Sequence, residues 1–311
     1  MNKTVVIEPY KDTIAYKEWL APAERLGTVI CCHGLGDTAG AFDIMAPVLA
    51  NKGFRVLAID LPGHGLSSHT GRYSLYHIAE CLLRFITELD LFQTQEDIFL
   101  VSHSFSAEAA PFLAGTYPNL FRKIVQLDNP GPVDLRELTK DPFTNRPHPD
   151  YRYKLKKFYE GATYKKKRNP PSYGSVEEAA KIRLESVPSF FRIDEQAAYN
   201  ISKRAYASID GKNFHPCQDP MIMKDNWPGG AGQICLREDV EALVENISAP
   251  CLLIKFDSWK EKWWVKAHEP LLRAYKFLEC ESVEGPHHAF AMSQTGEVCG
   301  NMIAEFFMRE I

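Results

Sequence analysis

The sequence predicts an α/β fold with a mostly parallel, doubly wound sheet. Short apolar runs alternate with amphipathic helical patterns along the first 130 residues. The apolar runs are nearly continuous, as expected for parallel strands that are covered on both faces. At residues 97–106 such a run passes through a serine into an Ala-rich helical pattern. With 311 residues and a net charge of −4, the chain is long enough for one large domain that carries an insertion.

The first part of the chain, residues 1–132, supplies these elements in order. Residues 1–10 read as a short strand, and residues 39–51 read as a helix that ends at Gly53, a residue suited to helix C-termini. Ser74 opens an amphipathic helix to about Leu91, because apolar residues recur there at helical spacing. Further strands are predicted at 26–32, 54–60, 98–101 and 121–127, and a further helix at 106–117.

The strand–helix alternation stops at residue 133, and we expect an insertion over 133–248. Ser175 and Glu178 form a capping-box pattern before a short helix to Glu185. Two more helices are expected, one from Ile193 past Ala205 and one over 237–246. Strands at 251–254 and 277–283 and a helix at 297–309 then complete the core in residues 249–311. A helical insertion over the strand ends is placed to act as a lid that excludes water.

The most informative motif is Ser102-His-Ser104-Phe-Ser106 on the predicted strand-to-helix turn. A nucleophile elbow needs very small residues two places before and two places after its serine, because the turn is tight. Glycine usually stands there, whereas this chain has Ser102 and Ser106, whose hydroxymethyl groups we expect to crowd the turn. Ser104 is the predicted nucleophile.

The other parts of an acyl-transfer site follow in the order Ser, Asp, His. A serine hydroxyl needs a base and the base needs an orienting carboxylate, while the oxyanion needs two donors. The backbone N–H groups of Leu35 and Phe105 are the predicted donors. The base is expected in the loop after the last strand, where His287 follows Gly-Pro and is favoured over its neighbour His288.

Two aspartates can supply the orienting carboxylate. Asp128 ends the strand that follows the elbow helix, before the sharp bend Asn129-Pro-Gly-Pro132. Asp257 follows the next strand of the core. Asp128 is favoured because the bend would aim its side chain at the strand end, and Asp257 remains the alternative. His33, His64 and Asp60 are expected to have structural roles.

Taken together, these motifs resemble the α/β-hydrolase superfamily over nearly the whole chain. The matching segments are His33-Gly34, Asp60-Leu-Pro-Gly-His-Gly-Leu-Ser67, the Ser104 elbow, Pro250-Cys-Leu-Leu-Ile254 and Gly285-Pro-His-His288. Within the insertion, Ser175-Val-Glu-Glu-Ala-Ala180, Ala205-Tyr-Ala-Ser-Ile-Asp-Gly211 and Asp219-Pro220 resemble the lid of the serine hydrolase-like, kraken-type branch. The resemblance implies the α/β-hydrolase fold with a helical lid, and it supports Asp128 because related hydrolases often carry the acid after that strand.

The favoured hypothesis is a serine hydrolase that cleaves a small-molecule carboxylic ester or thioester through an acyl-enzyme intermediate. The serine-substituted elbow motivates an alternative, a ligand-binding protein with slow or no turnover. Acyl transfer to another acceptor would use the same triad. No cofactor or metal is expected, since the chain has no C-x-x-C pair and no H-E-x-x-H motif. The net charge gives no reason to expect nucleic acid, and without a signal peptide or a long apolar run we expect a cytoplasmic protein without membrane insertion.

Overall fold

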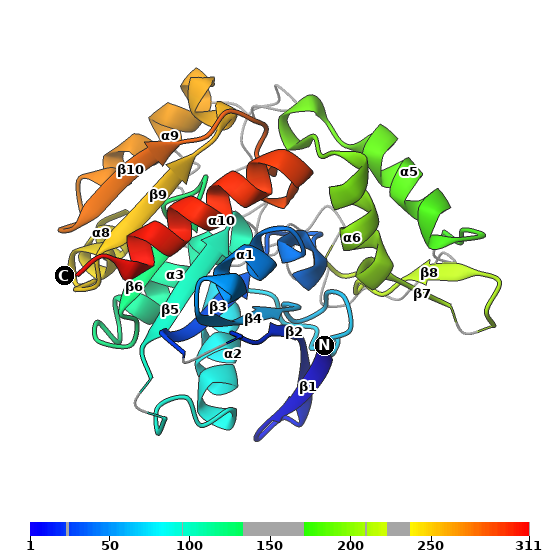
Figure 1. The fold of residues 1–311 in the computed structure, drawn as a ribbon, viewed down its shortest axis with the longest axis horizontal. Coiled ribbons are helices and arrows are strands. Elements are labelled where there is room, and N and C mark those ends of the chain that lie inside the picture. The colour runs from blue at the N-terminus through cyan, green and yellow to red at the C-terminus, as the bar shows by residue number, and fades with distance from the viewer. Residues whose placement is uncertain (23–24, 95, 133–170, 209, 223–236, 311) are drawn as a thin grey trace, which may run out of the picture.

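A central eight-stranded sheet runs through the molecule (Figure 1). The structure is a computed structural model, and it describes residues 1–22, 25–94, 96–132, 171–208, 210–222 and 237–310. The strand order is β1-β2-β4-β3-β5-β6-β9-β10. The strands are β1 (Asn2–Ile7), β2 (Asp12–Trp19), β3 (Gly27–Cys32), β4 (Phe54–Ile59), β5 (Ile98–His103), β6 (Lys123–Leu127), β9 (Cys251–Lys255) and β10 (Leu278–Ser282).

Six neighbouring strands of this sheet are parallel, which confirms the prediction of a mostly parallel sheet. They are, in their order across the sheet, β4, β3, β5, β6, β9 and β10. Strands β1 and β2 pair antiparallel with each other, and β2 pairs antiparallel with β4. Strand β2 was not among the predicted elements. The carboxyl ends of β3, β5, β6, β9 and β10 therefore lie along one edge of the sheet, where sites of parallel α/β folds form.

Helices cover both faces of the sheet. Side chains alternate along β3, so that Ile30 and Cys32 join the core on one face while Val29 and Cys31 join the core on the other. One core lies under α2 (Leu75–Glu88), α3 (Phe105–Ala114) and α8 (Arg237–Glu245). The opposite core lies under α1 (Met45–Asn51) and α10 (Ser293–Met308).

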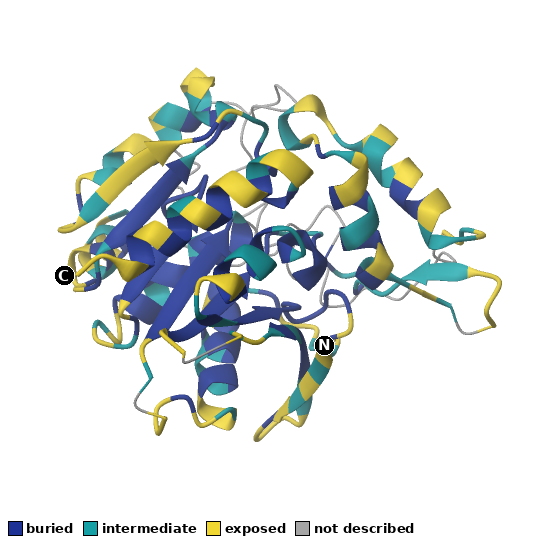
Figure 2. Cartoon of the chain, in the orientation of Figure 1, coloured by how far each residue is buried: buried dark blue, intermediate teal, exposed yellow. Residues whose placement is uncertain are grey.

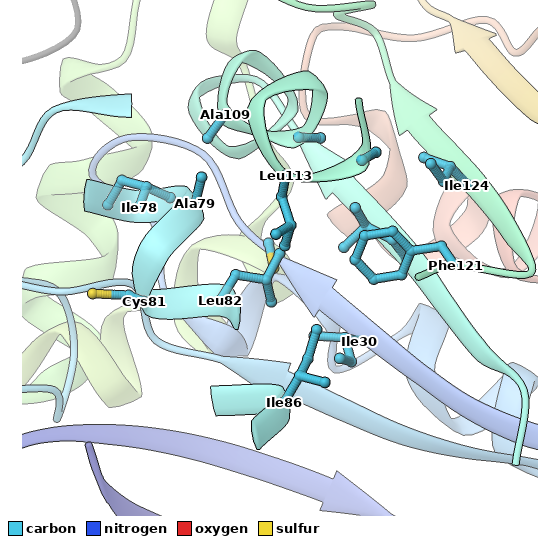
Figure 3. Packing of buried hydrophobic residues seen from close by; sticks show 14 of the residues in the cluster. Ile30, Ile78, Ala79, Cys81, Leu82, Ile86, Ala109, Leu113, Phe121 and Ile124 are labelled. Carbon is cyan, nitrogen blue, oxygen red and sulfur yellow. The ribbon is translucent and has the colours of Figure 1, made fainter. Parts of the chain in front are cut away.

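The first of these cores is drawn in Figure 3, where Leu82 and Ile86 of α2 and Leu113 of α3 gather over Ile30 of the sheet. In Figure 2 the inner strands are buried along their length, whereas β10 is partly or fully exposed and forms an edge. No helix in the described ranges combines the length and apolar character that crossing a bilayer requires.

Several predicted helices have different limits in the structure. The pattern predicted one helix over 39–51, but the segment forms a 3₁₀ turn, η1 (Ala39–Phe42), followed by α1. Pro47 has no N–H to bond the carbonyl of Asp43, so it suits the first turn of a new helix and not the middle of a longer one. Helices α2 and α3 end at Glu88 and Ala114, earlier than predicted, and α10 begins earlier, at Ser293.

The segment between β6 and β9 holds the predicted insertion, 133–248, of which residues 171–208, 210–222 and 237–248 are described. We call the described residues from 171 to 222 the insertion. It contains α5 (Val176–Ser186), the 3₁₀ turn η3 (Ser189–Phe191), α6 (Glu195–Ala205) and the hairpin β7 (Tyr206–Ser208) and β8 (Phe214–Pro216). Figure 1 shows α5 and α6 set to one side of the sheet. Residues 133–170 and 223–236 lie outside the described residues. Helix α8, which was predicted as part of the insertion, packs with α3 against the sheet.

Capping side chains fix where the insertion's helices begin. The hydroxyl of Ser175 accepts a hydrogen bond from the N–H of Glu178 at 3.1 Å, as the capping-box pattern predicts. Asp194 caps α6 by accepting from the N–H of Ala197 at 2.8 Å. Helix α6 then approaches η1 so closely that a Cβ on Gly40 would lie 2.2 Å from the carbonyl oxygen of Asn200. Glycine at position 40 therefore allows the insertion to dock on the core.

Candidate active site

The predicted nucleophile lies on a sharp turn between β5 and α3. Ser104 has φ 51° and ψ −114°, a backbone conformation that non-glycine residues rarely adopt. Such strain persists only where the surrounding structure imposes it, and it is frequent at functional sites. The turn matches the geometry that a nucleophile elbow requires: a serine between the end of a parallel strand and the start of a helix.

The elbow accommodates both of its unusual serines. The hydroxyl of Ser106 donates to the carbonyl of Cys32 at 2.6 Å and accepts from the N–H of His103 at 3.0 Å. Ser106 therefore ties the elbow to β3. The hydroxyl of Ser102 is buried without a partner among the described residues and lines a small, largely apolar cavity under α3. Both hydroxymethyl groups are therefore buried, that of Ser106 in hydrogen bonds and that of Ser102 against the cavity.

The loop after β3 lies directly against the nucleophile. A Cβ on Gly34 would come within 3.0 Å of the Cβ of Ser104 and 2.9 Å of Nδ1 of His103, so only glycine fits there without displacement. Leu35 follows Gly34, and its N–H has no hydrogen-bond partner among the described residues. Phe105 is the first residue of α3, so its N–H has no carbonyl of that helix to bond. The two predicted oxyanion donors are thus N–H groups next to Ser104 and Gly34.

The predicted base and acid meet in the structure. Nδ1 of His287 lies 2.6 Å from Oδ2 of Asp128, and both side chains are buried. The other carboxylate oxygen of Asp128 accepts from the N–H of Phe256 at 2.9 Å, and the hydroxyl of Ser258 donates to the same carboxylate. Asp128 has a positive φ of 66°, as expected of a residue held in a special conformation.

The alternative acid, Asp257, is placed differently. Its side chain is 42% exposed and forms an ion pair with Lys260 at 2.6 Å. An exposed carboxylate that is already paired with a lysine is not positioned to orient a buried histidine. Of the two aspartates, it is Asp128 that lies against His287.

The environment of His287 favours its neutral form. Burial lowers the pKa of His287, and the hydrogen bond to Asp128 opposes that effect without cancelling it. With Nδ1–H donated to Asp128, Nε2 is the atom that can accept a proton. The structure contains no hydrogen bond between Ser104 and His287. In hydrolases this bond is frequently long before substrate binds.

Aromatic side chains surround the His287 ring. Phe190 stacks on it with ring centroids 5.5 Å apart, and Phe191 and Trp264 approach it edge-on at 5.3 and 5.5 Å. The N–H of His287 also donates to the carbonyl of Phe190 at 3.2 Å. Since Phe190 and Phe191 belong to η3, the insertion shields this histidine from water.

The second candidate base, His288, has a separate carboxylate partner. Its Nε2 lies 3.0 Å from Oδ2 of Asp37, which is fully buried in the loop after β3. Arg183 of α5 pairs with the other oxygen of Asp37. Neither Asp37 nor Arg183 was among the site residues predicted from the sequence. The position of Asp37, two residues after the predicted oxyanion donor Leu35, is the feature of the sequence that points to it.

Asp37, His103 and His288 also form a group that could hold a metal ion, since their ligand atoms all lie within 4.8 Å of one another. The charge of Asp37 is already met by Arg183, however, and Nε2 of His288 is hydrogen-bonded to it. An ion would have to displace that hydrogen bond next to a guanidinium. The donor set therefore fits a hydrogen-bonded ion-pair network better than a metal site.

Two further histidines and an ion pair support the loops around the site. Nδ1 of His33 lies 2.7 Å from the carbonyl of Gly34, and its Nε2 accepts from the N–H of Leu61. His64 likewise accepts from the N–H of Gly36 at 3.1 Å. Asp60 accepts from the N–H groups of Ala39 and Leu66 and pairs with the buried Arg204 at 2.7 Å. These contacts give His33, His64 and Asp60 the structural roles that were expected of them.

A family model described as the alpha/beta hydrolase fold matches residues 27–186, which is more than half of the chain. The chain belongs to the α/β-hydrolase family. A serine hydrolase-like protein of Dictyostelium discoideum is 25% identical over 308 residues, covering 96% of this chain and 79% of that protein. A serine hydrolase-like protein of Danio rerio is 29% identical over 185 residues, 59% of this chain and 52% of that protein.

Solved structures confirm the predicted α/β-hydrolase fold. A hypothetical protein of Pseudomonas aeruginosa PAO1 superposes with a TM-score of 0.77 at 21% identity, over 99% of both chains. The thioesterase domain of the curacin biosynthetic pathway superposes with a TM-score of 0.73 at 19% identity, again over 99% of both chains. At these identities the likeness concerns the fold alone.

Proposed function

We propose that this α/β-hydrolase is a serine hydrolase that cleaves a small-molecule carboxylic ester or thioester through an acyl-enzyme intermediate. The single observation that carries the proposal is the buried His287–Asp128 pair beside a strained serine elbow. A neutral, oriented histidine and an elbow serine are the two parts that nucleophilic acyl transfer needs.

In the first half-reaction, Ser104 Oγ attacks the substrate carbonyl while Nε2 of His287 takes the hydroxyl proton. Asp128 holds Nδ1–H and stabilises the imidazolium that forms. The negative charge on the carbonyl oxygen is held by the N–H groups of Leu35 and Phe105. The tetrahedral intermediate then collapses, the bond to the alcohol or thiol breaks, and His287 returns the proton to that leaving group.

In the second half-reaction, a water molecule replaces the leaving group. His287 removes a proton from the water, the resulting oxygen nucleophile attacks the acyl carbonyl, and Ser104 departs with the proton that His287 returns. The products are the carboxylic acid and the free enzyme. Acyl transfer to an alcohol or amine would follow the same steps with that acceptor in place of water, so product analysis with competing nucleophiles separates the two reactions.

The likeness in fold to a thioesterase domain agrees with acyl chemistry and supports including thioesters among the substrates to be screened. A serine at the elbow disfavours the epoxide hydrolase and dehalogenase chemistry of this superfamily, which uses aspartate at that position. No cofactor enters any of these steps.

Covalent labelling with a fluorophosphonate probe, followed by intact-mass measurement and peptide mapping, tests the proposal. Wild type is expected to carry one adduct on Ser104, and Ser104→Ala to carry none. Ser102→Ala is the matched control, since this hydroxyl lies two residues away and is buried without a described partner. Ser102→Ala should label like wild type. Folded wild-type protein that forms no adduct and hydrolyses no activated ester would favour a ligand-binding protein on the same fold.

A further inference from the structure

The strongest feature that the proposed reaction does not use is a link between the insertion and the loop after β3. Arg183 lies on α5, and its side chain is 19% exposed. Its Nη1 donates to the carbonyl of Gly36 at 2.9 Å, and its Nη2 donates to Oδ1 of Asp37. One guanidinium thus holds two consecutive residues of the core loop from a distance of 146 positions along the chain. A planar guanidinium suits such a two-point contact better than an ammonium group does.

Asp37, which Arg183 holds, also lies close to two histidines of the site. Its second oxygen, Oδ2, lies 3.0 Å from Nε2 of His288 and 3.9 Å from Nδ1 of His103. His288 adjoins the proposed base, and His103 adjoins the proposed nucleophile. Burial disfavours the charged form of Asp37, but attraction to His288 and Arg183 lowers its pKa well below the usual range, so the carboxylate is ionised. One buried charge therefore connects α5, the elbow and the base loop.

The contact matters because Gly36 and Asp37 directly follow the proposed oxyanion donor. The orientation of the Leu35 N–H depends on the Gly34–Leu35 peptide group, whose carbonyl accepts from the N–H of Asp37 at 3.2 Å. Asp37 can keep that bond only while its own backbone stays in place. Gly36, between them, has φ +77° and no side chain to fix it. His33 also contacts the Gly34 carbonyl at 2.7 Å, and His64 accepts from the N–H of Gly36 at 3.1 Å. Arg183 adds the restraint that comes from the insertion, since it holds both the Gly36 carbonyl and the Asp37 carboxylate.

We propose that Arg183 is a positioning residue for acyl transfer: by holding Gly36 and Asp37 it keeps the Leu35 N–H directed at the oxyanion, so that catalysis depends on the docking of α5. This inference rests on the proposed hydrolase function. Oxyanion donors act mainly on the transition state, so a displaced donor lowers kcat more than it raises KM. A misplacement of about 1 Å can cost about 100-fold in rate.

The test compares Arg183→Met, Arg183→Lys and Arg183→Ala with wild type. Lys181→Met is the matched control, because it removes a positive charge from the same helix at a side chain that is 74% exposed. We expect Arg183→Met to lower kcat about 100-fold with little change in KM, and to weaken binding of a boronic acid transition-state analogue in parallel. Lys181→Met should keep the kcat and KM of wild type. Arg183→Lys should retain part of the activity, and millimolar methylguanidinium should restore part of the activity of Arg183→Ala.

A purely structural role for Arg183 gives different results. A lower kcat that merely follows a lower fraction of folded protein, with boronate affinity per folded molecule unchanged, would overturn the inference. So would a wild-type kcat in folded Arg183→Met. Thermal unfolding of each variant supplies the folded fraction.

Hydrogen exchange separates this inference from the proposed function. In Arg183→Met the amides of residues 33–38 should exchange faster than in wild type and Lys181→Met, because their restraint is lost. If wild type neither labels nor hydrolyses esters, the proposed function fails, while faster exchange would still support the hold of Arg183 on this loop. Unchanged exchange in Arg183→Met would overturn the inference whatever the activity of wild type.

Discussion

Asp128 and His287 stand 159 positions apart in the chain, yet Oδ2 of Asp128 lies 2.6 Å from Nδ1 of His287. The sheet brings them together. Asp128 follows β6, His287 follows β10, and β9 lies between these two strands. Phe256, which follows β9, donates its N–H to Asp128, so the carboxylate is held across the end of the intervening strand. The order of the parallel strands therefore determines where the carboxylate of Asp128 lies.

Asp128→Asn is expected to lower kcat by a factor of about 10⁴ while the protein stays folded, because an amide would hold the wrong tautomer of His287. Asp257→Asn is the matched control. Its side chain is exposed and lies outside the pair, so its kcat should equal that of wild type. Ester hydrolysis by the two purified variants measures the difference. A large loss in Asp257→Asn with near-normal Asp128→Asn would reassign the acid.

The pH profile of kcat/KM should give His287 an apparent pKa below 6.5, the ordinary value for histidine. Protonated imidazole cannot accept the serine proton, so activity falls as the pH drops through the pKa of the free enzyme. Since burial lowers that pKa, the enzyme should keep more than half of its plateau kcat/KM at pH 6.5. An activated ester without titratable groups, assayed from pH 4 to 8, gives the profile. An inflection at or above pH 7 would contradict the buried, neutral histidine.

The elbow could be predicted from sequence because its requirements are local. The strand, the small residues around Ser104 and the helix all fall within about 20 positions, and the tight turn restricts them directly. The order Ser, Asp, His along the chain then left two candidates for the base, His287 and His288, and two for the acid, Asp128 and Asp257. Choosing between Asp128 and Asp257 needed the structure, since both follow strands that end at the same edge.

The elements that were not predicted have weak local signals. The turn between β1 and β2 contains Pro9 but neither Gly nor Asn, and it is Lys11 that adopts the positive φ of 57° that usually indicates Gly or Asn. The Asp37–Arg183 pair joins residues 146 positions apart, from the core and from the insertion. No spacing pattern in the sequence connects these two residues, because they meet only after α5 has packed against the core.

Gly34→Ala should impair the site more than its small size suggests. The added methyl would lie 3.0 Å from the Cβ of Ser104 and 2.9 Å from His103, in a buried region where neighbours cannot move freely. We expect a loss of about 1–3 kcal/mol in the free energy of unfolding together with a lower kcat. Gly174→Ala is the control, because its methyl would meet only the end of the Glu178 side chain at 3.2 Å. Denaturant unfolding and ester hydrolysis, measured side by side, test both effects. Equal stability and activity in the two variants would mean that the loop after β3 is not packed as tightly as the geometry indicates.

The buried histidines beneath the site predict acid-sensitive folding. Burial lowers the pKa of His33 to about 4 and that of His64 to about 3. In the unfolded chain both would titrate near 6.5, so below that pH the unfolded state takes up protons that the folded state does not. The free energy of unfolding therefore falls as the pH drops from about 6.5 towards 4, by up to about 3 kcal/mol for a shift of the size found at His33.

His64→Gln isolates one of these contributions. Glutamine can still accept from the N–H of Gly36 but cannot be protonated in this pH range, so the variant should lose less stability than wild type between pH 7 and 4. His69→Gln is the control, since His69 is exposed, and its pH dependence should follow wild type. Urea unfolding at pH 7, 6, 5 and 4 gives the free energies. If His64→Gln and wild type show parallel pH dependences, His64 takes up a proton as readily in the folded protein as in the unfolded chain, which would contradict the lowering of its pKa by burial.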